Sequence, residues 1–324
     1  MKNREYYIFP FYSKQRNLSG NTYLKQFTDS FASTSKINDK FGRYGVISLF
    51  FNLQSQVFIF HWLESISKKK QAFALFVGFV FLRLLNKKII WVLHNKRPHK
   101  EDSHLGEFCM GVAARFSNYI VCHSKEGFLF VKDTYGERIA KKVSYIPHPV
   151  YHTQIHKSEE YKWDIIVWGN ILPYKNILEF VKFIKKTSEM HNLNILICGN
   201  CKDEEYAKEI ENNLTSNITF IKGFIKEEEL KKYICQSKAL LFTYKLDSVL
   251  SSGSLIYSLN FNKLIIGPDG GAFKDLGEIV ICYENFSDLQ EIDYSREVCS
   301  NDIKLYLAKN TWELLPNKIN SLLE

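Results

Sequence analysis

Two short segments in the second half of the chain carry residue types that bind phosphate. They are Ser251-Ser252-Gly253-Ser254, which precedes an apolar run, and Gly270-Gly271, which follows a short apolar strand. Small polar residues at the start of a helix leave backbone N–H groups and hydroxyls available to a phosphate. A glycine pair lets the backbone approach a ligand closely. The structural alternatives are an ordinary helix cap and an ordinary turn. The pattern favours an enzyme that uses a nucleotide-linked donor.

A cation stands near the start of the same half. Lys175 follows a predicted strand that ends at Gly169, and a predicted helix begins directly after it. A lysine there could neutralise the negative charge that develops on a leaving diphosphate. A solvated lysine at a helix start is the structural alternative.

Polar side chains also end two apolar segments of the first half. His94 and Asn95 follow one of them, and His61 and Glu64 flank a tryptophan after the other. A histidine or a carboxylate at the end of a buried strand could hydrogen-bond a sugar or move a proton. Glu64 is the best single candidate for a general base toward an acceptor hydroxyl. Buried structural side chains are the alternative.

The net charge is divided unevenly between the two halves. Residues 1–155 contain 23 Lys+Arg and 10 Asp+Glu, a balance of +13, and the remainder contains 20 and 25, a balance of −5, which sum to the +8 of the whole chain. A basic half beside an acidic half predicts two domains with different partners. The basic half could face anionic lipid, a pyrophosphate-linked acceptor or nucleic acid.

Strand-like apolar runs alternate with helical stretches throughout the sequence. Strands are expected at 6–10, 57–61, 88–94, 119–123 and 143–147, and again at 163–168, 194–198, 218–221, 239–244, 263–266 and 278–282. Helices are expected at 21–33, 68–85 and 103–116, and at 177–191, 204–214, 227–237, 253–260 and 302–323. This alternation predicts parallel sheets covered on both faces, in two doubly wound α/β domains of residues 1–153 and 154–324 with a cleft between them. The last helix could pack back on the first domain.

The sequence shows no signal peptide, and the cysteines lack the spacing of a disulfide framework, so we expect a cytoplasmic protein. The longest apolar run, 72–82, is too short to span a bilayer. Lysines at 68–70 and 87–88 flank it, which suits either a helix on the inner face of the cell membrane or a buried helix.

A series of motifs in order resembles the GT-B glycosyltransferases, and in particular the bacterial polysaccharide-assembly enzymes of glycosyltransferase family 4. Gly20-Asn21-Thr22-Tyr23 is similar to the "NPY" loop, Phe60-His61-Trp62-Leu63-Glu64 to "HLHWPE", Leu93-His94-Asn95 to "VHN", Cys122-His123-Ser124 to "VHS", Ile146-Pro147-His148 to "IPHG", Ile171-Leu172-Pro173-Tyr174-Lys175-Asn176 to "IRPYKG", and the segment 247–271 to "DVLTSGSLLLALSFGKPVIAP..G". The resemblance runs almost end to end. It implies a GT-B fold of two Rossmann-like domains.

The resemblance also assigns roles to residues. It implies a second domain that binds a nucleoside-diphosphate sugar through Gly169, Lys175, Ser251, Ser252, Gly253, Ser254, Gly270 and Gly271. In the first domain it implies catalytic roles for His94, Glu64 and His61, and substrate contacts from Gly20, Asn21 and Asn95.

Three departures from the family pattern concern the donor site. Leu172 replaces the arginine that is usual in the family, which removes one candidate phosphate contact. Val249 and Tyr257 stand where the wider family has the paired glutamates that contact the ribose and the sugar. No Asp-x-Asp triplet occurs, which argues against a metal-dependent GT-A enzyme and for metal-independent chemistry. No cofactor other than the donor substrate is expected. His148, His152 and His156 are four apart, but the prolines at 147 and 149 exclude a metal-binding helix there.

The sequence therefore predicts a metal-independent glycosyltransferase of the hexosyltransferase type. It would transfer a sugar from a nucleoside-diphosphate sugar to a glycan acceptor, lipid-linked and used in capsule, O-antigen or exopolysaccharide synthesis, with an anionic membrane surface as a further partner. The alternatives are a GT-B sugar-nucleotide epimerase and a non-catalytic glycan- or nucleotide-binding protein. A nucleic-acid partner is not expected, since no recognition motif for one occurs.

Overall fold

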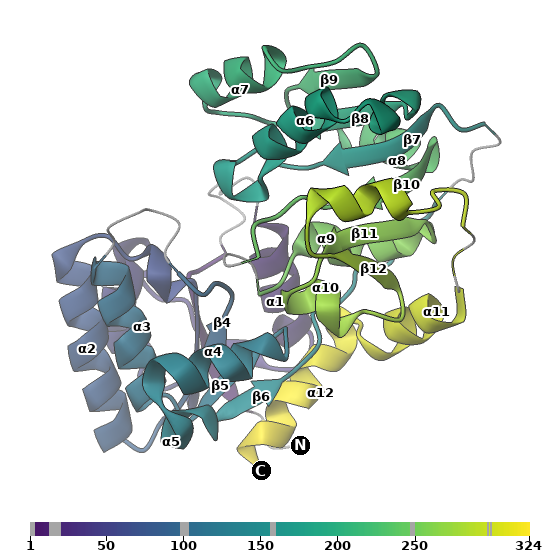
Figure 1. The fold of residues 1–324 in the computed structure, drawn as a ribbon. Coiled ribbons are helices and arrows are strands. Elements are labelled where there is room, and N and C mark those ends of the chain that lie inside the picture. The colour runs from purple at the N-terminus through teal and green to yellow at the C-terminus, as the bar shows by residue number, and fades with distance from the viewer. Residues whose placement is uncertain are drawn as a thin grey trace. The chain divides into compact units, whose positions relative to one another are not determined.

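The computed structural model describes residues 4–12, 21–97, 104–155, 160–246, 250–296, 298 and 300–324. Its contacts divide the chain into two compact units (Figure 1). Unit 1 comprises Met1–Pro149 and Asn310–Glu324, and unit 2 comprises Val150–Lys309. The predicted functional domain limits, residues 1–153 and 154–324, stay a prediction.

Unit 1 is built on a parallel sheet with the strand order β2-β1-β3-β4-β5-β6. Its strands are β1 (Glu5–Phe9), β2 (Lys36–Ile37), β3 (Val57–His61), β4 (Lys88–Leu93), β5 (Tyr119–Cys122) and β6 (Val143–Tyr145). The central strands are almost continuously apolar because both of their faces are buried, as is usual for parallel sheets.

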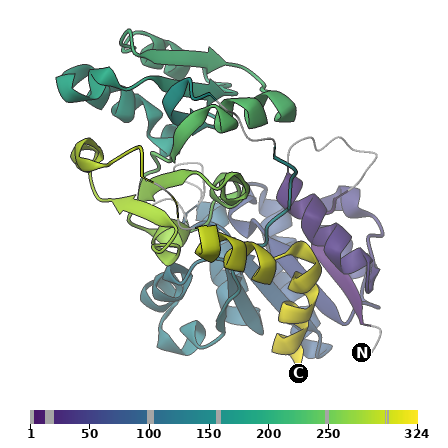
Figure 2. The same ribbon diagram turned by 90° about the vertical axis from the view of Figure 1, so that its right-hand side faces the viewer.

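Helices cover both faces of this sheet. The α-helices of unit 1 are α1 (Thr22–Ala32), α2 (Lys69–Leu84), α3 (His104–Phe116), α4 (Glu126–Tyr135), α5 (Glu137–Ala140) and α12 (Leu315–Asn320), and its short 3-10 segments are η1 (Gly42–Phe51), η2 (Leu63–Ser65), η7 (Trp312–Leu314) and η8 (Ser321–Leu323). Phe27 of α1 and Ile319 of α12 pack in one core with Ile59 of β3. Phe60, the next residue of β3, contacts Phe79 of α2 on the opposite face. Figure 2 shows α12, in yellow, beside this sheet.

Unit 2 repeats the same plan with the strand order β12-β11-β10-β7-β8-β9. Its strands are β7 (Trp163–Trp168), β8 (Ile195–Gly199), β9 (Ile218–Lys222), β10 (Ser237–Leu241), β11 (Leu264–Pro268) and β12 (Val280–Tyr283). Its helices are α6 (Ile177–Lys186), α7 (Glu204–Glu211), α8 (Glu227–Cys235), α9 (Gly253–Ser258), α10 (Gly271–Asp275) and α11 (Ser300–Lys309), with 3-10 segments η3 (Pro173–Lys175), η4 (Ser188–Asn192), η5 (Leu259–Phe261) and η6 (Phe286–Glu291). One core forms around α6 and α7, and the other around α8 and α9.

The structure confirms a strand at each predicted position but corrects the C-terminal helix. The helix expected over 302–323 is divided into α11 and α12. Pro316 lies in the first turn of α12, where its missing N–H is harmless, but it could not continue a helix from α11. Strand β2 and helices α4, α5 and α10 were not expected. Among the described residues no helix is long and apolar enough to cross a membrane.

Replacing Gly199 at the end of β8 with alanine should strongly destabilise unit 2. A Cβ there would lie 1.7 Å from the carbonyl oxygen of Gly169, and the φ of Gly199 is +155°. Such a clash with backbone is expected to lower the free energy of unfolding by about 2 kcal/mol or more. Gly111→Ala is the control, because a Cβ at that helical position meets nothing within 4 Å. Urea unfolding of both variants measures the difference, and an unchanged transition for Gly199→Ala would contradict this close approach of the two loops.

Candidate functional site

The predicted donor residues of unit 2 come together where its sheet changes direction. From β7 the chain proceeds through β8 and β9 on one side, whereas β10, β11 and β12 continue from the other side of β7. In open parallel sheets ligands bind at the carboxyl ends of the strands beside such a switch point. Gly169 and Lys175 follow β7, and residues 251–254 follow the adjacent β10.

Lys175 is a buried cation in this switch region. Its side chain is only 5% exposed, and among the described residues no carboxylate forms an ion pair with it. The Nζ atom lies 5.1 Å from the centroid of the Tyr244 ring. A buried charge without a carboxylate partner is costly, so this arrangement favours an anionic ligand.

Gly169 holds the space in front of this lysine open. Its φ is +108°, and a Cβ on it would lie 2.9 Å from Lys175 Nζ and 3.5 Å from Ser254 Oγ. The ammonium group and the hydroxyl therefore face one small region that only a glycine leaves free.

The serines differ in how they are engaged. Ser252 caps α9, because its Oγ accepts a hydrogen bond from the backbone N–H of Leu255 at 3.3 Å. The same Oγ lies 3.2 Å from the hydroxyl of Tyr244. The Oγ of Ser251 is buried and has no hydrogen-bond partner among the described residues. Capping thus explains Ser252 in part, whereas Ser251 keeps an unused hydrogen-bonding group.

The glycine pair lies beside these serines. Gly270 precedes α10 and Gly271 is its first residue, with a φ of +55°. The backbone N–H of Ala272 donates to the carbonyl of Leu250 at 2.9 Å, which connects this loop to the serine segment. The segment 247–249 lies outside the described residues, so the structure does not place Val249.

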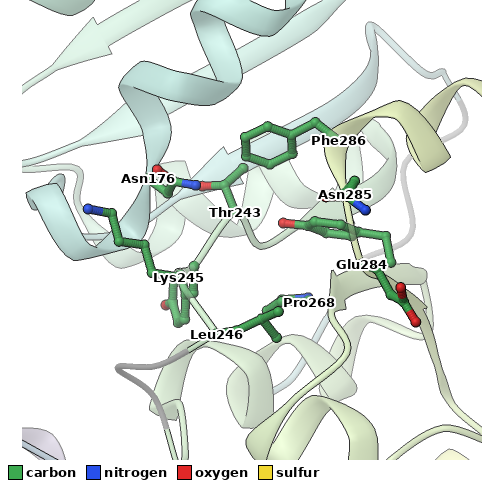
Figure 3. Close-up of a pocket in the computed structure, with 10 residues that line it drawn as sticks. Asn176, Thr243, Lys245, Leu246, Pro268, Glu284, Asn285 and Phe286 are labelled. Atoms are coloured by element: carbon green, nitrogen blue, oxygen red, sulfur yellow. The ribbon is translucent and has the colours of Figure 1, made fainter.

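A pocket of about 410 Å³ opens at the same strand ends (Figure 3). It is lined by Asn176, Thr243, Tyr244, Lys245, Leu246, Pro268, Tyr283, Glu284, Asn285 and Phe286. Figure 3 shows Asn176 and Lys245 on one side, opposite Asn285. Tyr244 belongs both to this pocket and to the surroundings of Lys175, so the pocket adjoins the predicted phosphate site.

In unit 1 the histidines at the strand ends gather around one tyrosine. We call Tyr23, His61, His94, His123 and His148 the histidine cluster. The ring centroid of Tyr23 lies between 4.9 and 5.7 Å from those of the four histidines. His61 is the last residue of β3, and His94 and His123 directly follow β4 and β5; these three strands are adjacent in the sheet. Tyr23 stands in the first turn of α1.

Hydrogen bonds fix the orientation of His123. Its Nδ1 donates to the carbonyl of Ile146 at 2.7 Å, so its Nε2 accepts from the hydroxyl of Tyr23 at 2.7 Å. His148 donates from Nδ1 to the carbonyl of Pro149 at 2.8 Å.

His94 is the member of the cluster best placed to meet a ligand. It retains 8% exposure, whereas His61 is inaccessible. The ring of His94 stacks on Trp62 at 4.3 Å, and its Nε2 lies 3.1 Å from Nδ1 of His61. Among the described residues no partner engages Nδ1 of His94, so that nitrogen is available to a ligand.

Burial keeps the histidine cluster uncharged. It lowers the pKa of His61 to about 3, that of His123 to about 4 and that of His148 to about 3. The pKa of His94 is lowered well below its usual range by burial and by the neighbouring histidines. Neutral imidazoles donate and accept hydrogen bonds near neutral pH, whereas pKa values this low disfavour uptake of a proton.

Glu64 lies buried beside this cluster. Its Oε1 accepts a hydrogen bond from Nδ2 of Asn95 at 2.7 Å, and its Oε2 has no partner among the described residues. Burial raises the pKa of this carboxyl to about 7. The contact orients Asn95, which follows His94 in the chain.

We expect Glu64 to make stability depend on pH. A carboxyl whose pKa is raised in the folded state favours folding most below its unfolded pKa of 4.5, and this contribution is lost as the pH rises through about 7. Glu64→Gln should remove this loss, so that between pH 4.5 and 8 the wild type loses about 3 kcal/mol relative to the variant. Denaturant unfolding across this range measures the difference, with exposed Glu205→Gln as the control. Parallel pH profiles of wild type and Glu64→Gln would contradict a carboxyl with a raised pKa.

The other predicted residues of unit 1 have simpler surroundings. Asn21 caps α1, because its side chain accepts from the backbone N–H of Leu24 at 3.1 Å. Gly20 lies outside the described residues. No roles were predicted from the sequence for Tyr23, His148 or Tyr244. Tyr23 and His148 lie within the motif segments of the family resemblance, and Tyr244 stands shortly after β10. Among the described residues no group of three or more potential ligands could hold a metal ion.

Comparisons with known proteins agree with this architecture. Residues 152–248 match the family described as glycosyl transferases group 1. Among solved structures, HepE of Anabaena, determined with UDP and glucose, has a TM-score of 0.68 at 11% identity, with 99% of each chain covered. WaaB, a lipopolysaccharide outer core galactosyltransferase, has a TM-score of 0.59 at 10% identity and covers 98% of this chain and 99% of its own. TarM has a TM-score of 0.58 at 15% identity and covers 83% of this chain and 55% of its own.

The chain has the GT-B fold. Its resemblance to the group 1 glycosyltransferases is confirmed, by the family match over 152–248 and by the fold of both units. No curated protein gives a significant sequence match.

Proposed function

We propose that the protein is a glycosyltransferase whose donor is a nucleoside-diphosphate sugar. The observation that carries this proposal is the buried ammonium group of Lys175, which faces the same open region as Ser254 Oγ above Gly169. Transfer of the sugar leaves negative charge on the diphosphate, and a preorganised cation with nearby hydroxyls stabilises that charge. The family match over residues 152–248, which include Gly169 and Lys175, supports the same class of donor, as does the neighbour HepE, solved with UDP-glucose.

The rest of the donor has a place next to the phosphate site. The pocket has a largely apolar lining to which Thr243, Lys245 and Asn285 add polar groups, and it adjoins Lys175 through Tyr244. We propose that part of the donor beyond the diphosphate occupies it. Since Lys175 supplies a fixed positive charge, we propose a hexosyl transfer that needs no metal or other cofactor.

We propose that the histidine cluster is the catalytic part of unit 1. His94 would contact the substrate through its available Nδ1, and His61 would position it through the bond to Nε2. We propose Glu64 as the general base toward the acceptor hydroxyl. Its hydrogen bond to Asn95 supports a role in positioning that amide as well.

The acceptor is proposed from the charge of the chain. The +13 balance of residues 1–155 suits a glycan carried on a pyrophosphate-linked lipid, as used in capsule, O-antigen or exopolysaccharide synthesis at the inner face of the cell membrane.

Calorimetric titration with UDP, GDP, CMP and dTDP, with and without EDTA, tests the donor proposal. We expect one nucleotide to bind selectively and its affinity to be unaffected by EDTA. Release of nucleoside diphosphate from the matching nucleotide sugar, dependent on a glycan acceptor, would then distinguish a transferase from an epimerase. Failure of every nucleotide to bind would contradict the donor site.

A further inference from the structure

Helix α2 of unit 1 exposes an apolar face along its whole length. Phe73, Phe76, Val77, Phe81 and Leu84 follow the spacing of one helical face, and all five are exposed. Phe73 is 69% exposed and Leu84 is 78% exposed. The opposite side of α2 is buried against the sheet, so the helix is apolar on both sides. An exposed apolar surface of this extent marks an interaction site.

Neighbouring elements extend this face on both sides. The exposed side chains Phe41, Tyr44, Ile47 and Phe51 come from η1 and the residue before it, and Phe108 comes from α3. The ring of Phe81 lies 6.4 Å from that of Phe50 in η1, and Phe76 lies 6.4 Å from Phe108. Figure 1 shows α2 and α3 side by side in unit 1. We call these exposed residues, together with the five of α2, the apolar face.

Positive charges stand at both ends of α2. Lys68, Lys69 and Lys70 are exposed at its start, Arg83 lies in its last turn, and Lys87 and Lys88 follow it. Helix α2 contains no acidic residue. Within the described part of the chain, none of these cations forms an ion pair with a carboxylate. The nearest acidic residue of α3, Glu107, is 3.8 Å from His104 of its own helix.

We propose that the apolar face docks on the surface of an anionic lipid bilayer. The aromatic side chains would enter the boundary between headgroups and acyl chains, while the flanking lysines and Arg83 contact the phosphates. A helix of 16 residues is about 24 Å long and would lie in the plane of the membrane. This docking does not depend on the proposed enzymatic activity.

The charge pattern argues against a second copy of the chain as the occupant. If two α2 helices packed face to face in antiparallel orientation, Lys68–Lys70 of one would meet Arg83 and Lys87 of the other. In parallel orientation Lys68–Lys70 of one helix would meet the same lysines of the other, and Arg83 and Lys87 would meet their counterparts. Both arrangements place uncompensated cations together, which is unfavourable, whereas anionic headgroups neutralise them.

Co-sedimentation of the full chain with vesicles tests this proposal. We expect binding to phosphatidylglycerol-containing vesicles, and binding at least about tenfold weaker to pure phosphatidylcholine. The double variant Phe73→Asp, Leu84→Asp should reduce binding about tenfold or more. Because both side chains are exposed, the variant should keep the circular dichroism spectrum and the nucleotide affinity of the wild type.

Two matched controls separate the contributions. Leu305→Asp changes an exposed leucine of unit 2, and it should leave vesicle binding unchanged. Replacing Lys68, Lys69 and Lys70 with glutamine should reduce binding to anionic vesicles more than the same change at the exposed lysines 186, 208 and 232. Equal vesicle binding by the apolar-face variant and the wild type would overturn the proposal. So would dimerisation without lipid that this variant abolishes, since the face would then join two copies.

Discussion

Replacing Lys175 with glutamine is expected to weaken the binding of a nucleoside diphosphate by about 10- to 100-fold. The side chain is buried, and its ammonium group faces the region that Gly169 leaves open beside Ser254. Glutamine keeps much of the length of the side chain but removes the charge that the diphosphate would meet. Calorimetric titration of the variant measures the loss.

Comparing the nucleoside with the nucleoside diphosphate separates a contact with the phosphates from an effect on the fold. The matching nucleoside without phosphates should bind wild type and Lys175→Gln equally, because only the phosphates contact the cation. Lys185→Gln, which changes an exposed lysine of α6, should leave both affinities as they are. An equal loss of nucleoside and nucleotide binding would mean that Lys175 supports the fold rather than the diphosphate.

Replacing His94 with glutamine is expected to lower the rate of sugar transfer by about 100-fold or more, with little change in nucleotide affinity. His94 retains access to solvent, and its Nδ1 is the ring nitrogen without a partner in the described part of the chain. Lys175 and the serines belong to unit 2, so the donor diphosphate should bind as before. Steady-state kinetics and titration of the same protein measure the two effects separately.

His104 supplies the matched control for this variant. It is an exposed histidine at the start of α3, and His104→Gln should leave the rate unchanged. A His94→Gln variant that is folded and fully active would contradict a catalytic role for His94. A loss of nucleotide affinity as large as the loss of rate would show that His94 acts through donor binding.

The elements that position the site could be read from the sequence because their signals are local. Each parallel strand is a short apolar run, and residues such as His94 and Gly169 stand at the ends of these runs. Parallel strands present their carboxyl ends at one edge of a sheet, so the order of these residues in the chain already indicates that they gather.

What the sequence could not predict depends on contacts between distant residues. The position of Tyr23 at the centre of the histidine cluster requires the packing of α1 against β3 and β4. The complete burial of His61 and Glu64, and hence the raised pKa of that carboxyl, follows from the same packing. The break between α11 and α12 was missed because the helical pattern continues across Asn310 and Thr311.

A crystal structure of the protein with the nucleoside diphosphate selected by titration would show directly where the diphosphate binds. We expect phosphate oxygens within about 3 Å of Lys175 Nζ and within hydrogen-bond distance of Ser251 or Ser254. A nucleotide bound at another place in the chain, with Lys175 Nζ still beside the Tyr244 ring and in contact with no phosphate, would contradict it.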